Sequence, residues 1–188
     1  LNLNLGSGRH LLFISDESAT VGDSAVTITN GLISGLAPAG ITFVVDNPSG
    51  NFADGITIWA GSGNVAISVT GTHERPGLRT ITTLNAGAGD DRVTVTLNAA
   101  TDGFFVLNTQ DGNDSVDGSS STLSFVVFGG LGADVVTGGS GRDIIFGDQG
   151  RVEYVSAGQI VAWLGNGGPG DKTDGVIRAP TSIYTVNP

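Results

Sequence analysis

Apolar residues in this chain occur in short runs of alternating or β-branched residues, and each run ends within a few positions at Gly, Asn or Asp. Such runs predict β-strands, because an amphipathic helix would repeat its apolar positions every three to four residues, and that periodicity is hard to find here. The sequence therefore predicts an all-β fold. The expected strands cover residues 26–29, 41–45, 56–60, 65–69, 80–84, 93–97, 104–107, 124–128 and 144–146.

The turns between these runs share one register. Aligned on the turn glycines Gly8, Gly63, Gly89, Gly112, Gly132 and Gly150, the segments place Leu3, Ile58, Leu84, Leu107, Val127 and Ile145 five residues earlier. Four residues later stand Leu12, Ile67, Val93, Val116, Val136 and Tyr154. Two apolar columns beside one column of turns predict a right-handed parallel β-helix, or β-solenoid. The interval between Gly8 and Gly63 is expected to hold one further coil, built from residues 26–29 and 41–45, whose register the pattern leaves open.

The repeat fades after Gly150. Residues 151–155 and 159–163 flank a short turn, which is typical of a β-hairpin, and a Gly-rich loop follows over residues 165–175. A solenoid needs its last apolar column covered. We therefore expect the hairpin, which carries Tyr154, to cap the last coil together with the loop.

Composition narrows the class of protein. The chain of 188 residues is 39% hydrophobic and 6% aromatic, which predicts an aliphatic, thin core. Gly at 31 residues without a Gly-X-Y period indicates many turns. Cys is absent, and no hydrophobic run approaches the ~18 residues of a membrane helix, so we expect neither disulfides nor membrane insertion. Because Met is also absent and the chain starts in strand-like alternation, we expect a processed product or a part of a longer protein.

Acidic residues dominate the charge, which is −10 at pH 7. Of 18 acidic residues 15 are Asp, and nine of these lie between residues 90 and 148 together with two Arg. Such an acidic strip argues against nucleic acid as a partner. Asp is both a turn former and a hard oxygen ligand for cations.

In four turns an Asp stands two residues after the turn glycine, and an aliphatic residue stands two residues after that Asp. Adjacent coils of a parallel sheet lie about 4.8 Å apart, so equivalent Asp residues are expected to form a column. Two carboxylates at about 5 Å repel each other by about 3 kcal/mol at an effective dielectric constant of about 20, and a bound cation reverses this effect. The instances are Gly89, Asp91 and Val93; Gly112, Asp114 and Val116; Gly132, Asp134 and Val136; and Gly141, Asp143 and Ile145.

Calcium is the cation that this column favours. Ca²⁺ accepts six to eight oxygen ligands in a forgiving geometry, and Gly-rich turns expose carbonyls beside the carboxylates. Mg²⁺ requires a stricter octahedron, and the absence of Cys and the presence of only two His remove the usual ligands of zinc and copper.

Two consecutive nonapeptides follow the pattern Gly-Gly-x-Gly-x-Asp-x-aliphatic-x. The first has Gly129, Gly130, Gly132, Asp134 and Val136, and the second has Gly138, Gly139, Gly141, Asp143 and Ile145. This segment resembles the RTX (repeats-in-toxin, hemolysin-type) calcium-binding family. The resemblance implies a parallel β-roll in which the Asp side chain and turn carbonyls hold calcium between successive turns, in a secreted bacterial protein.

Degenerate copies extend the resemblance. Residues 86–94 lack the first Gly, residues 109–117 have Thr109 and Gln110 in place of both, and residues 147–155 have Val152 in place of Asp. The N-terminal half is therefore expected to be an ordinary solenoid that grades into the calcium-binding type. We expect a solenoid over residues 1–150, with its calcium-binding part over about 85–150, and the cap over 151–188.

Nine residues make half of an RTX coil, so Asp143 is expected on the side opposite Asp134, where the preceding coil offers few ligands. Our hypothesis places the main ions in the column of Asp91, Asp114 and Asp134. The other expected metal-site residues are Asp143, Asp111 and Asp148 and the turn residues Gly89, Gly112, Gly130, Gly132, Gly139 and Gly141.

Simpler interpretations apply to other acidic residues. Asp also favours turns without any metal, and this is our interpretation of Asp90, Asp102 and Asp117. Asp90 and Asp91 resemble a catalytic carboxylate pair, but neighbouring residues in a strand point to opposite faces. We therefore expect no enzyme activity from them.

The sequence thus predicts a calcium-stabilised extracellular β-solenoid module with a structural or adhesive role in a larger secreted or cell-surface protein. One alternative is a carbohydrate-active β-helix enzyme or the non-catalytic calcium-binding module of one. A second alternative is the subunit of an extracellular filament that associates end to end through free strand edges. The expected partners are calcium ions, with a second copy or a surface glycan as further candidates.

Overall fold

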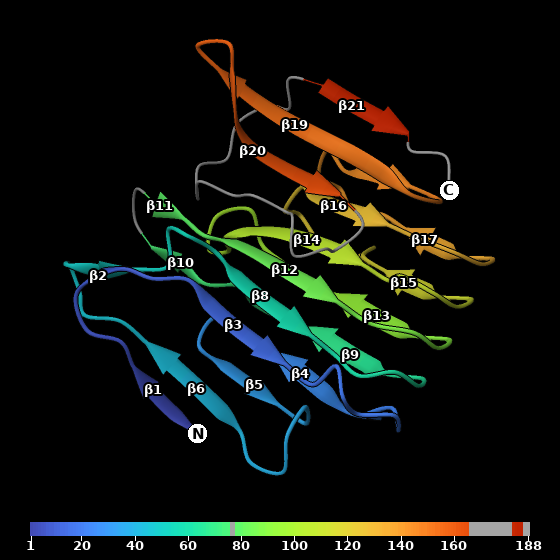
Figure 1. Cartoon of the computed structure of the whole chain (residues 1–188), viewed down its shortest axis with the longest axis horizontal. Coiled ribbons are helices and arrows are strands. Elements are labelled where there is room, and N and C mark those ends of the chain that lie inside the picture. The colour runs from blue at the N-terminus through green and yellow to red at the C-terminus, as the bar shows by residue number, and fades with distance from the viewer. Residues whose placement is uncertain (76–77, 166–181, 186–188) are drawn as a thin grey trace.

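The computed structural model describes residues 1–75, 78–165 and 182–185. Every regular element among these residues is a β-strand, as the sequence predicts. Most strands belong to two long sheets that face each other, and Figure 1 shows successive coils of the chain side by side, from blue to orange. No helix in the described part of the chain is long and apolar enough to cross a membrane.

The first sheet has six strands, all parallel, in the order β18-β16-β14-β12-β8-β3. It consists of β3 (Leu12–Ser15), β8 (Ile56–Trp59), β12 (Ile81–Asn85), β14 (Phe104–Asn108), β16 (Phe125–Phe128) and β18 (Ile144–Phe146). Each of these strands up to β16 is followed in the chain by a strand of the second sheet. One coil therefore contributes one strand to each sheet.

The second sheet has eight strands in the order β1-β6-β5-β4-β9-β13-β15-β17 and is parallel from β4 to β17. Its strands are β1 (Asn2–Asn4), β4 (Val26–Ile28), β5 (Leu32–Ser34), β6 (Ile41–Val44), β9 (Ala66–Val69), β13 (Arg92–Val95), β15 (Ser115–Asp117) and β17 (Val135–Thr137). Parallel sheets linked coil by coil confirm the all-β, parallel class. The right-handed sense of the coil stays a prediction.

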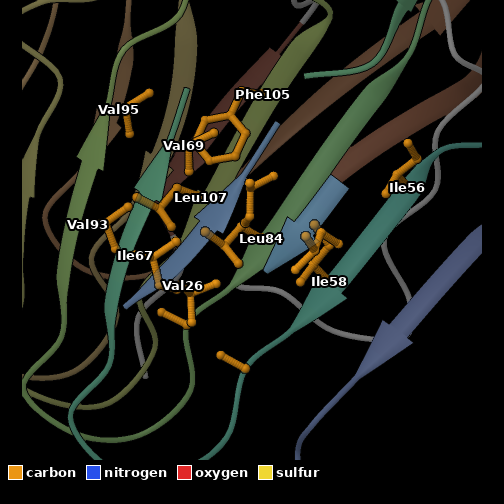
Figure 2. Packing of buried hydrophobic residues seen from close by; sticks show 14 of the residues in the cluster. Val26, Ile56, Ile58, Ile67, Val69, Leu84, Val93, Val95, Phe105 and Leu107 are labelled. Atoms are coloured by element: carbon orange, nitrogen blue, oxygen red, sulfur yellow. The ribbon is translucent and has the colours of Figure 1, made fainter. Parts of the chain in front are cut away.

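The predicted apolar columns are confirmed from residue 58 onward. In the first sheet the aligned residues are Ile58, Leu84, Leu107, Val127 and Ile145, and in the second they are Ile67, Val93, Val116 and Val136. Figure 2 shows Ile58, Leu84 and Leu107 of the first sheet and Ile67 and Val93 of the second, which belong to one shared core. Ile145, at the end of the first column, is 44% exposed. Because the columns fill the space between the sheets, the turns that join the sheets are held in the same register.

The alignment is wrong at both ends. Ile14 precedes Ile58 and Val26 precedes Ile67, where the alignment has Leu3 and Leu12. Gly8 lies instead in β2 (Gly8–Arg9), which pairs with β7 (Gly50–Asn51). The first coil carries a longer turn between its two strands, so a fixed offset from a glycine does not describe it. Tyr154 is also outside the column, because it lies in an antiparallel hairpin.

Residues 26–45 do not form the predicted further coil. β4, β5 and β6 form an antiparallel meander in the second sheet, and β1 extends the sheet in parallel to β6. The physical reason is the Asn30–Gly31 pair, which favours a tight turn and folds β5 back on β4. Residues 41–44 therefore add a strand to the second sheet and do not cross to the first one.

A three-stranded antiparallel sheet follows the last coil, in the order β20-β19-β21. It consists of β19 (Gly150–Ser156), β20 (Gln159–Gly165) and β21 (Ser182–Thr185), so the predicted hairpin is confirmed. Tyr154 and Val152 belong to one buried cluster with Phe128 and Phe146, whose rings stack at 4.8 Å. The hairpin thus packs on the outer face of the first sheet. Most of the predicted loop lies outside the described residues, and the division at residue 150 and the closure of the last coil stay predictions.

A smaller hairpin interrupts the coil after β9. It is formed by β10 (Glu74–Arg75) and β11 (Leu78–Arg79), which pair in antiparallel orientation. His73, which directly precedes β10, packs edge to face on Phe52 with 4.7 Å between the ring centroids. It does not belong to the turns described below. This insertion lies outside the repeating register.

Candidate metal centre

Three consecutive turns bring the predicted Asp column together. They connect β12 to β13, β14 to β15 and β16 to β17, and they contain Asp91, Asp114 and Asp134. Parallel bridges from Ala88 to Asp111 and from Asp111 to Leu131 hold the turns in register. The column predicted from the sequence is therefore present in the structure.

Each carboxylate of the column binds the backbone of the preceding coil. The Val65 N–H donates to Asp91 Oδ1 at 2.8 Å, the Asp91 N–H donates to Asp114 Oδ1 at 2.8 Å, and the Asp114 N–H donates to Asp134 Oδ1 at 3.0 Å. Hydrogen bonds to a charged acceptor each contribute about 1.5–3 kcal/mol. One oxygen of every Asp is therefore used to join successive coils.

The second oxygen of every Asp in the column has no partner. Asp91 Oδ2, Asp114 Oδ2 and Asp134 Oδ2 are all buried and lack a hydrogen bond. Asp91 and Asp114 are 2% and 1% exposed. A buried carboxylate oxygen without a donor is costly, so three of them in one column form an arrangement that favours a cation.

The electrostatics of the column reflect this lack of partners. Burial raises the pKa of Asp91 to about 7, although the Val65 N–H lowers it, and the nearby Asp114 carboxylate raises it further. Burial likewise raises the pKa of Asp114 above its ordinary value, against the effect of the Asp91 N–H. Both groups resist ionisation in the absence of a cation, and a bound divalent ion favours their charged form.

A second ladder of hydrogen bonds runs beside the first and was not predicted. Asn64 Oδ1 accepts the Asp90 N–H at 3.0 Å, Asp90 Oδ1 accepts the Asn113 N–H at 2.8 Å, and Asn113 Oδ1 accepts the Ala133 N–H at 3.1 Å. The recurrence of Asn or Asp directly before the Asp position was a readable signal. This ladder joins coils without any metal, which agrees with the turn interpretation of Asp90.

The turn glycines allow the coils to approach closely. Gly89, Gly112 and Gly132 have φ values of +131°, +148° and +131°, which L-residues with a side chain rarely adopt. A Cβ atom at Gly112 would collide with the Gly89 carbonyl, and one at Gly132 would collide with the Gly112 carbonyl. These carbonyls therefore lie in the narrow gap between turns, on the side of the Asp column.

Asp143 lies on the opposite side, as predicted, and differs from the column. Its Oδ1 accepts the Phe125 N–H at 3.1 Å, and its Oδ2 accepts the Gly139 N–H at 2.8 Å. A Cβ atom at Gly141 would collide with the backbone of Leu123 and Ser124. Since both carboxylate oxygens have donors, this side lacks the unsatisfied oxygen that marks the column.

The other two predicted acidic ligands, Asp111 and Asp148, join adjacent turns through their main-chain carbonyls. Asp111 and Asp148 have exposed side chains, while their carbonyls accept the Gly89 N–H at 2.7 Å and the Gly130 N–H at 3.3 Å. In the described part of the chain, no three His, Asp or Glu side chains gather around one point. A cation beside the column would therefore lie between two adjacent coils and take most of its ligands from turn oxygens.

Gly-rich turns that offer only oxygen atoms as ligands are typical of a calcium-binding parallel β-roll. Residues 126–151 match the family described as RTX calcium-binding nonapeptide repeat (4 copies). RTX nonapeptide repeats bind calcium ions, so calcium is the ion of this segment. No curated protein and no solved structure matches the chain. The matched residues include Asp134, Asp143 and Asp148, whereas Asp91 and Asp114 lie in the coils before them.

Proposed function

We propose that this chain is a calcium-stabilised structural module, and that its main ions lie between coils beside Asp91, Asp114 and Asp134. The observation that carries the proposal is the row of three buried Oδ2 atoms without a hydrogen-bond partner. The family match over residues 126–151 supports calcium as the ion. Each proposed ion has one or two carboxylates and the carbonyls of turn glycines as ligands.

The proposed mechanism is conditional folding. Bound calcium supplies positive charge to a column that otherwise holds unsatisfied carboxylates. The Asp Oδ1 atoms join each coil to the preceding one, while the Oδ2 atoms face the ion. Binding to the folded state alone stabilises that state, so the module is expected to form fully where calcium is abundant.

This mechanism suits an extracellular location, which we propose together with a structural or adhesive role in a larger secreted or surface protein. Extracellular calcium modules work with dissociation constants of about 10⁻⁴ to 10⁻³ M, so weak sites suffice there. RTX repeats occur in secreted bacterial proteins, which supports the same location.

We further propose that the module is not catalytic. The two ladders support this, because Asp90 Oδ1 accepts an N–H from the following coil and Asp91 Oδ1 accepts one from the preceding coil. The two carboxylates are therefore committed to different neighbours. A shared general acid and base would need them to face one substrate.

The first test is the variant Asp114→Asn. The Asn side chain keeps an oxygen for the Asp91 N–H but replaces Oδ2 by an amide nitrogen, which cannot bind a cation. We expect isothermal titration calorimetry with CaCl₂ to show one ion fewer per chain, or about tenfold weaker binding at one site.

The matched control is Asp102→Asn. Asp102 is 6% exposed, and its two oxygens accept the Thr72 N–H at 2.9 Å and the Asn98 N–H at 2.7 Å, so it has no oxygen left for an ion. This variant should lose folding stability and keep the calcium stoichiometry. Unchanged calcium binding by Asp114→Asn would reject the proposed column.

A further inference from the structure

Thr109 occupies a special position in the turn that contains Asp114. It is the first residue of its nonapeptide, where the two full repeats have Gly129 and Gly138. The side chain is 0% exposed. Its hydroxyl donates to the Gly129 carbonyl at 2.6 Å and lies 3.4 Å from the Phe128 carbonyl. A polar side chain is thus inserted between two adjacent coils of the column.

The geometry of the full repeats shows where a side chain at this position points. A Cβ atom at Gly129 would lie 2.5 Å from Asp134 Oδ2, and one at Gly138 would lie 2.6 Å from Asp143 Oδ2. The first residue of each repeat therefore faces the carboxylate of the same repeat. Consistent with this placement, the Thr109 side chain lies close enough to the Asp114 carboxylate to interact with it.

The oxygens at this point outnumber the hydrogens. Thr109 has one hydroxyl hydrogen, and the Gly129 carbonyl at 2.6 Å receives it. Asp114 is 1% exposed, and its Oδ2 has no donor. Asp114 Oδ2, the Thr109 hydroxyl and the Gly129 carbonyl thus have only the one hydroxyl hydrogen between them in a buried place, which is an environment that favours a cation.

We propose that Thr109 is a calcium ligand, supplying its hydroxyl oxygen beside Asp114 Oδ2 and the Gly129 carbonyl. This inference rests on the proposed function of the column. Without the ion, the Thr109 hydroxyl donates its hydrogen to the Gly129 carbonyl. With the ion, rotation about the Cβ–Oγ1 bond turns the hydrogen away and directs a lone pair at calcium. The degenerate repeat 109–117 is then a complete site in which a side-chain oxygen is an added ligand.

The test compares Thr109→Val and Thr109→Ser in the full chain. Valine keeps the shape and removes the oxygen, whereas serine keeps the hydroxyl. By calorimetric titration with CaCl₂, we expect Thr109→Val to bind one ion about tenfold or more weakly and Thr109→Ser to stay within about twofold of the parent. Thr109→Ala is the substitute if the valine variant does not fold, because Ala86 fills the same position one coil earlier with 0% exposure.

Thr72→Val is the matched control. Thr72 is 1% exposed, its hydroxyl donates to the Gly103 carbonyl at 3.1 Å, and its neighbour Asp102 has both oxygens satisfied. This control should lose stability and keep its calcium affinity. Calcium binding by Thr109→Val that equals or exceeds that of the parent overturns the ligand role. If Asp114→Asn loses an ion and Thr109→Val does not, only this inference fails; if the parent chain binds no calcium, the proposed function fails as well.

Discussion

At the scale of single residues, each Asp of the column divides its carboxylate between two tasks. Oδ1 accepts a backbone N–H from the preceding coil, and Oδ2 is left buried and unpaired in Asp91, Asp114 and Asp134. The sequence predicted the column because offset and aliphatic partner recur together. It did not predict the ligand role that we propose for Thr109. The motif has Gly at this position, so a comparison with the motif registers Thr109 only as a mismatch.

Gln110 is a second departure with a measurable cost. Its φ of +77° is in the left-handed region, where the neighbouring repeats have Gly87 and Gly130 at +103° and +92°. Such a conformation costs an L-residue about 1–2 kcal/mol, and replacement by glycine removes this cost. Glycine also makes the unfolded chain more flexible, which offsets part of the stabilisation. We expect Gln110→Gly to raise the free energy of unfolding by about 0.5–1 kcal/mol in urea titrations.

Gln149→Gly is the control for this prediction. Gln149 is not among the residues with positive φ, so the substitution adds only freedom to the unfolded chain and should lower stability. A loss of stability in Gln110→Gly similar to that in Gln149→Gly would show that the turn conformation at position 110 is not strained.

At the scale of elements, the strands were predictable and the connections only in part. All the predicted strands between residues 56 and 146 are present, because period-two apolar patterns select the face that packs in the core. The register between residues 58 and 145 followed from turns of constant form. The N-terminal register did not, because Gly8 pairs with Gly50 and the Asn30–Gly31 turn reverses the chain. That Asn-Gly pair was the signal available for the hairpin.

The turn glycines make an element-scale prediction that is independent of calcium. A Cβ atom at Gly132 would collide with the Gly112 carbonyl, and φ is +131° there. The two coils would have to separate, so we expect Gly132→Ala to lower the free energy of unfolding by about 2–4 kcal/mol, measured in chelator. Gly147→Ala, where a Cβ would meet nothing within 4 Å, should change it by less than about 1 kcal/mol. Equal effects of the two substitutions would contradict the close-stacking role.

At the scale of the whole molecule, apolar residues fill the interior of the solenoid and acidic residues lie in its stacked turns. The interior is filled by aliphatic columns that need no ion, and the hairpin of β19 and β20 buries part of the outer face of the first sheet. The acidic turns are stacked along one side, in a chain with net charge −10. The apolar core therefore supplies the framework of the fold, while the turns set how its stability depends on ions.

This division predicts opposite responses to pH with and without calcium. Burial raises the pKa of Asp91 from 3.8 to about 7, so the calcium-free folded state holds a proton that the unfolded state releases. Its contribution to stability is present at low pH and is lost as the pH rises through about 7. We expect the melting temperature of the chelated protein to rise when the pH falls from about 8 to about 6.5. Burial lowers the pKa of His73 from 6.5, so this group acts with the opposite sign, and its effect becomes large only as the pH falls below about 6.5.

Calcium should reverse the trend, because protons compete with the ion for the same carboxylates. The stabilisation conferred by excess CaCl₂, measured as the difference in melting temperature from the chelated protein, should shrink over the same fall in pH. Asp91→Asn removes the titrating group while its side-chain oxygen can still accept the Val65 N–H, so it should flatten the response of the chelated protein. A chelated parent protein that melts at a lower temperature near pH 6.5 than near pH 8 would show that Asp91 is ionised in the calcium-free fold, and that the Asp column does not control its stability.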